Sequence, residues 1–146
     1  MSTVTPRVDP VPVLNGLLRV LYRSLPMYLV EAKPWVDRRC EKLYAAVTHV
    51  AADQRLFAQR LAEAILAHGG RPQPGSFPPQ FTSTHDLAVD FLLKRLIENQ
   101  RRDVQAVRLA AGQLAETPEL AALAEEILGN ARGHLETLEQ ALGPGP

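Results

Sequence analysis

The sequence has one cysteine, few aromatic residues and no excess of either charge. Cys40 is the only cysteine among 146 residues, so no intrachain disulfide can form. The 16 basic and 16 acidic residues cancel, which leaves no net field to attract nucleic acid or an anionic membrane surface. We therefore expect neither nucleic acid nor a membrane as a partner, and the cysteine usage favours a cytoplasmic protein.

Long apolar runs are also missing. Arginines, histidines or prolines interrupt every apolar segment before the roughly 20 residues that a membrane span needs. The start, Met1-Ser2-Thr3-Val4, has no charged segment leading into an apolar one, which a secretory signal would have. No transmembrane helix and no leader are expected.

Apolar residues recur instead at alternating steps of three and four, which is the period of an amphipathic helix. Prolines and glycines divide these stretches, and connections of a few residues make helical neighbours antiparallel. We predict an all-α chain folded as one four-helix bundle of two antiparallel hairpins joined by a long crossover. Its parts are a flexible arm over 1–11, a bundle over 12–142 with helices at about 12–33, 37–68, 84–115 and 118–142, a crossover over 69–83, and a tail over 143–146.

Four local signals set the expected helix ends. Pro26 lies inside the first helix and removes a backbone bond, so a kink or break is expected there. Gly69-Gly70 is a C-terminal cap signal for the second helix. The segment 83–86, Ser-Thr-His-Asp, is a candidate N-terminal cap for the third helix, and Thr117-Pro118 for the fourth.

The connection between the hairpins is long enough to cross the bundle. Gly69 to Thr84 contains four prolines, and sixteen extended residues reach roughly 50 Å, about the length of a 30-residue helix. The prolines stiffen this segment, so we expect it to form an extended strap, a name used below for the crossover, and not a disordered loop.

Three polar residues interrupt the apolar stripes at a similar depth: Gln54, Gln100 and His134. They could form a neutral hydrogen-bond network around a buried water, and a satisfied amide in a bundle core fixes helix register. A pocket for a small molecule or a metal is the alternative. On the register interpretation, replacing both glutamines with leucine should preserve folding and raise stability.

The pattern resembles the ferritin-like superfamily, in particular its bacterioferritin and rubrerythrin branches, over nearly the whole chain. The residues that carry the resemblance are Leu14-Asn15, the segment 28–32 (Tyr-Leu-Val-Glu-Ala), the end of the second helix at 58–66 with Gly69-Gly70-Arg71-Pro72, and Gly133-His134-Leu135 near Leu138. The resemblance implies a homodimer, with the first two helices supplying much of the interface, and a site where glutamates and Glu-x-x-His pairs bind two metal ions.

Most of the implied ligand positions carry other residues. They fall on Leu21, Gln54, Phe57, Gln100, Ala131 and His134. Two divalent ions bring about four positive charges into a low-dielectric interior, and neutral amides supply no charge to offset them. We therefore expect no metal and no other cofactor at these positions, with His134 the one residue of ligand type that is retained.

Displaced carboxylates are the remaining route to a metal site. Asp53, Glu98 and Asp103 lie at about the right level, but each is one to three residues off its stripe and should project away from the axis. His49, His68 and His85 are interpreted as packing or capping residues. A mononuclear site that combines His134 with an acidic neighbour stays open.

Two main hypotheses follow. The first is a metal-free, non-catalytic ferritin-like bundle with a structural or protein-interaction role and an unidentified partner. The second is a divergent metal-dependent oxidoreductase or iron-handling protein with an atypical iron or other divalent site around His134. A small ligand in the core is a third option.

Overall fold

The computed structural model describes residues 8–32, 41–86 and 88–142, and these residues form helices and connections without a strand. The elements are α1 (Pro10–Tyr22), α2 (Leu25–Ala32), α3 (Glu41–Ala67), the 3-10 helix η2 (Pro79–Asp86), α4 (Val89–Gln113) and α5 (Pro118–Leu142). The predicted all-α bundle is confirmed. The start of the second predicted helix at 37, the tail 143–146, most of the arm and Cys40 lie outside the described residues.

The first predicted helix, 12–33, is two helices. The chain leaves helical geometry at Arg23 and Ser24 and resumes at Leu25, so that Pro26 lies in the first turn of α2. Proline is tolerated there because the amide it lacks has no partner within the first helical turn.

The third predicted helix begins later than expected. The segment 83–86 belongs to η2, and α4 starts at Val89 after Ala88, whose side chain makes no capping bond. The hydroxyls of Thr82, Ser83 and Thr84 bond carbonyls three residues earlier in the chain instead of capping α4. Predicting a helix start at 83–86 was therefore wrong, because the Ser83 and Thr84 hydroxyls satisfy the 3-10 turns of the crossover.

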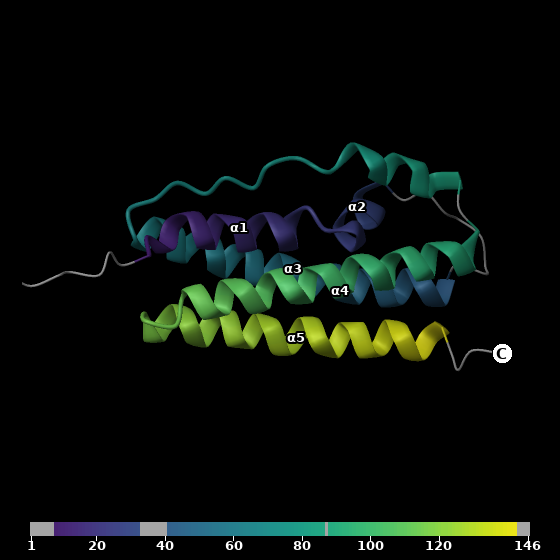
Figure 1. The fold of residues 1–146 in the computed structure, drawn as a ribbon. Coiled ribbons are helices and arrows are strands. Elements are labelled where there is room, and N and C mark those ends of the chain that lie inside the picture. The colour runs from purple at the N-terminus through teal and green to yellow at the C-terminus, as the bar shows by residue number, and fades with distance from the viewer. Residues whose placement is uncertain (1–7, 33–40, 87, 143–146) are drawn as a thin grey trace, which may run out of the picture.

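The helices form two hairpins, α1 and α2 with α3 and α4 with α5, and the crossover joins them (Figure 1). α1 and α2 pack on α3, α4 packs along α5, and α1 also contacts α4. α3 ends at a glycine cap, where Gly69 has a φ of 79° and the Gly70 amide donates to the Ile65 carbonyl at 2.9 Å. No helix of the described residues combines the length and apolar character needed to cross a membrane.

Polar side chains of α1 hold the crossover in an extended path. Asn15 donates to the Arg71 carbonyl at 3.1 Å and accepts from the Gln73 amide at 2.7 Å. One turn later Arg19 donates to the Gln73 carbonyl at 3.3 Å, and Arg23 donates to the Gly75 carbonyl at 2.7 Å.

The spacing of these contacts explains how the strap lies on the helix. Residues four apart on a helix share a face, and carbonyls two apart on an extended chain point the same way. The strap therefore follows α1 through bonds to its backbone, and it turns at Gly75, whose φ of 68° favours glycine.

The core consists of two apolar clusters with a polar layer between them. One cluster includes Leu21, Ala58, Val104 and Ala131, and the other includes Leu25, Val47, Ile97 and Leu138. On each long helix a buried polar residue falls between these two sets in sequence, and so does Ser24 at the α1–α2 break: Ser24, Gln54, Gln100, His134. The polar layer is where a functional site of the bundle has to be sought.

Candidate functional site

Three of the six positions that the resemblance assigns to ligands carry no ligand atom. Leu21 and Ala131 are buried members of the first apolar cluster, with 3% and 6% of their surfaces exposed. Phe57 is half-buried and packs against the same cluster. These side chains contribute packing at the polar layer and nothing that could bind an ion.

The two glutamines bond to separate protein groups. Gln54 accepts a hydrogen bond from the Ser24 hydroxyl at 2.6 Å through Oε1, and Ser24 Oγ in turn accepts from the Met27 amide at 3.2 Å. Gln100 donates from Nε2 to the Ala131 carbonyl at 3.0 Å. Among the described residues Gln54, Gln100 and His134 make no hydrogen bond with one another, so the three-residue network considered for them does not form.

One buried atom of this layer lacks a partner. Gln100 Oε1 accepts no hydrogen bond, and 2% of the residue's surface is exposed. A single neutral amide oxygen is a weak ligand, and two metal ions need several anionic ones. The six axial positions therefore do not fit a pair of iron ions.

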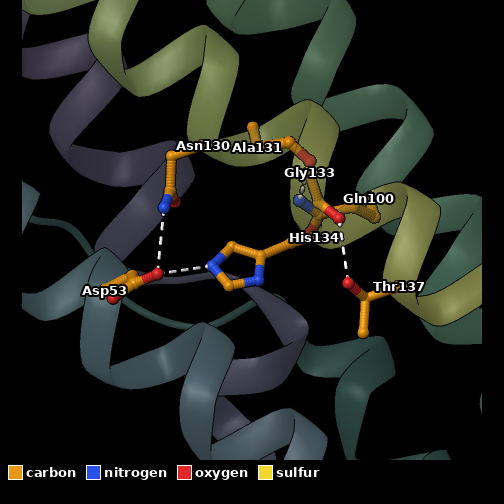
Figure 2. Close-up of polar contacts among 7 residues, drawn as sticks. All are labelled: Asp53, Gln100, Asn130, Ala131, Gly133, His134 and Thr137. Atoms are coloured by element: carbon orange, nitrogen blue, oxygen red, sulfur yellow. Dashed lines mark hydrogen bonds and ion pairs between the residues drawn. The ribbon is translucent and has the colours of Figure 1, made fainter.

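His134 turns away from the glutamines and toward α3. Its Nε2 lies 2.7 Å from Oδ2 of Asp53, and the Asn130 amide donates to the same oxygen at 2.9 Å (Figure 2). The His134 side chain is 7% exposed and that of Asp53 is 28% exposed. The carboxylate thus lies at the edge of the bundle, in the seam between α3 and α5, and the imidazole reaches it from the core.

His49 completes this group. Its ring packs edge-on against that of His134, with centroids 5.3 Å apart and an interplanar angle of 78°. One ligand-type atom from each of His49, Asp53 and His134 lies within 4.8 Å of the others. We name these three residues the seam cluster.

The electrostatics of the seam cluster favour an ionised carboxylate. The hydrogen bond from Asn130 lowers the pKa of Asp53 most, and the His134 contact lowers it further, while partial burial opposes them. The net effect is a pKa below the usual aspartate value, so Asp53 is a negative charge at neutral pH.

Asp53 projects away from the axial stripe, as expected, and lies in the seam between α3 and α5. A one-residue step does turn the side chain by about 100°, but on α3 that turn points it at α5, which packs alongside. His49, interpreted from the sequence as a packing residue, does pack its ring against that of His134, and this contact brings it into the group. Two spacings of four in the sequence could have signalled the group: His49 with Asp53, and Asn130 with His134.

The other two carboxylates considered for the site lie elsewhere. Glu98 is exposed and forms a loose ion pair with Arg95 at 3.9 Å. Asp103 lines a separate pocket of about 400 Å³ between α1, α4 and the strap, where burial raises its pKa to about 7. Neither belongs to the seam cluster, and His68 is exposed at the end of α3.

The described residues thus form a four-helix bundle with one long crossover and a polar layer between its two apolar clusters. No family model matches the chain, and no curated protein sequence matches it. Among solved structures it is similar to a ferritin-like, diiron-carboxylate protein from Bacillus anthracis, with 21% identity, a TM-score of 0.76 and coverage of 92% of this chain and 96% of that one.

It is also similar to the bacterioferritin of Rhodobacter capsulatus, a structure described as having a metal-free dinuclear site and a haem iron. The identity is 17% and the TM-score 0.76, over 95% of this chain and 86% of that one. The chain therefore has the ferritin-like fold, as the resemblance in its sequence indicated.

Proposed function

We propose that this chain is a ferritin-like bundle that does not assemble a dinuclear iron centre on its axis and serves as a non-catalytic structural or protein-interaction module. The observation that carries the proposal is the composition of the polar layer. Three implied ligand positions are the apolar residues Leu21, Phe57 and Ala131, and the others bond to protein groups.

The free energy of placing two iron ions on the bundle axis is also unfavourable. An iron pair on the axis would require breaking the bond between Ser24 and Gln54 and moving His134 off Asp53. It would regain only neutral amide oxygens and one neutral imidazole, which do not offset the desolvation of about four positive charges. The diiron chemistry named for the Bacillus anthracis structure therefore does not transfer to this axis.

A homodimer is the interaction that the exposed surface supports. The outer face of α3 carries Leu56 and Leu66, each 62% exposed. Beside it runs a groove of about 270 Å³ between α1, α3 and the strap, lined by Leu18, Tyr22 and Pro74 among others. Exposed leucines next to an apolar groove favour association with a second copy. A cytoplasmic location, favoured by the single cysteine, stays a prediction.

Iron loading tests the proposal. The untagged full chain is loaded anaerobically with ferrous iron and then exposed to oxygen, while bound iron per chain and oxygen consumption are measured. We expect no more than one iron per chain and oxidation no faster than in buffer. His134→Ala is the matched variant and should leave the oxidation rate unchanged. Two irons per chain, with oxidation that depends on His134, would overturn the proposal.

A further inference from the structure

We propose that the seam cluster, His49, Asp53 and His134, binds one divalent transition-metal ion of the zinc type between α3 and α5. This site is separate from the bundle axis and does not depend on the proposed function. Its ligands are two imidazoles and one carboxylate, and only His134 coincides with a position that the resemblance assigns to a ligand.

The distances are close to those that an ion requires. Zinc bonds of about 2.0 to 2.2 Å in a tetrahedron place ligand atoms roughly 3.3 Å apart. The His134–Asp53 pair, at 2.7 Å, has to open by several tenths of an ångström, and the widest separation, at most 4.8 Å, has to close. His49 is exposed, so its side chain can make this adjustment without disturbing the core.

The other two ligands are already held in place. His134 is buried against the core, and Asp53 is oriented by the hydrogen bond from Asn130. Metal sites characteristically contain such an outer donor, which fixes the direction of the ligating carboxylate. Asn130 is therefore a positioning residue for the ion and not a ligand.

The donor types select the ion. Imidazole nitrogen suits zinc, copper, iron and nickel, whereas magnesium and calcium prefer oxygen donors throughout. Asp53 supplies the one carboxylate among the three ligands. Three protein ligands leave a fourth tetrahedral position for water.

Solvent reaches the seam cluster at His49, which is exposed, and at Asp53, whose side chain is 28% exposed. Asp53 and Asn130 also line a pocket of about 500 Å³ that continues along the seam toward Glu63 and the ion pair of Arg60 with Glu126. The pocket provides an entry path for the ion, which a fully enclosed cluster would lack. Because its ligands come from two helices, a bound ion would link α3 to α5.

Cobalt and zinc titrations of the untagged full chain test the inference. We expect one Co²⁺ per chain with the visible absorption of a low-coordinate ion, displaced by Zn²⁺, and a higher melting temperature with zinc bound. His49→Ala should weaken binding by about 100-fold or more and Asp53→Asn similarly, because each removes a ligand or its charge; Asn130→Ala should weaken it by about 10- to 100-fold.

His68→Ala is the matched control, since His68 is another exposed histidine, directly after α3 and outside the cluster. It should bind cobalt like the wild type. His49 is exposed, so its alanine variant should fold, and circular dichroism checks this. Cobalt binding that is absent in the wild type, or equal in the folded His49→Ala and wild-type chains, overturns the inference. Neither result bears on the dinuclear iron test.

Discussion

Replacing Gln100 with leucine should stabilise the protein, and the sign follows from the bonds of one side chain. Gln100 is 2% exposed; its Nε2 donates to the Ala131 carbonyl, and its Oε1 has no partner. A buried unpaired acceptor costs about 1–3 kcal/mol, whereas one neutral hydrogen bond contributes about 1 kcal/mol. The Ala131 carbonyl lies within α5 and keeps its helical bond, so the substitution leaves no new unpaired group.

The expected gain in the free energy of unfolding is about 1–2 kcal/mol, once the buried leucine adds its own apolar contribution. For a chain of this size that corresponds to a rise in melting temperature of roughly 3–6 °C. Urea unfolding followed by circular dichroism measures the first quantity and calorimetry the second.

Gln54→Leu is the matched control, because it makes the same change in the same layer. Gln54 Oε1 accepts the Ser24 hydroxyl at 2.6 Å, and leucine would leave that buried donor unpaired. It should lower stability by about 1–2 kcal/mol. The sequence alone predicts that leucine at both glutamine positions raises stability, whereas the structure predicts a gain at Gln100 and a loss at Gln54. A Gln100→Leu chain less stable than wild type, or equal shifts for both variants, would refute the reasoning.

Three further predictions concern charge, association and the strap. Burial raises the pKa of Asp103 from 3.8 to about 7, so its stabilising contribution is complete below the unfolded pKa and is lost as pH rises toward 7. Asp103→Asn should therefore stabilise the chain by about 1–3 kcal/mol at pH 8 and by much less at pH 5. A shift of about three pKa units sets an upper limit of about 4 kcal/mol on this effect, and the expected value is smaller because solvent reaches the carboxyl group. Equal effects in urea unfolding at both pH values would contradict this. Leu56→Asp with Leu66→Asp should convert the proposed dimer into monomer in sedimentation experiments, whereas Leu109→Asp, on α4 and 71% exposed, should not; a dimer that survives the first pair places the interface elsewhere. Asn15→Ala should cost about 1–3 kcal/mol in urea unfolding because it unpairs two backbone groups of the strap, and a loss below 0.5 kcal/mol would show that the strap does not depend on this clamp.

The fold was predictable because its signals are local. Apolar periods and the glycine cap at 69–70 define long helices, and the length of the crossover restricts how the hairpins connect. The misassigned start of α4 shows where local signals fail. Hydroxyl residues at 83–86 satisfy a 3-10 turn as readily as they cap an α-helix, and only tertiary packing decides between the two.

The seam cluster was less predictable for a different reason. Stripe analysis divides each helix into a core face and a solvent face, but a bundle helix has two further faces that meet its neighbours. Asp53 lies on such a face, so it contacts α5 while its side chain stays partly exposed. The sequence contains the spacings of four that bring His49 beside Asp53 and Asn130 beside His134, yet nothing in it says that these two pairs face each other.

The most direct test of the central claim, that this bundle binds metal at its seam and not on its axis, is a crystal structure of the full chain grown with zinc and phased on the zinc anomalous signal. We expect one anomalous peak per chain, bounded by His49, Asp53 and His134, with Gln54 still bonded to Ser24. A pair of peaks on the axis beside Gln54 and Gln100, or a seam without zinc, would contradict it.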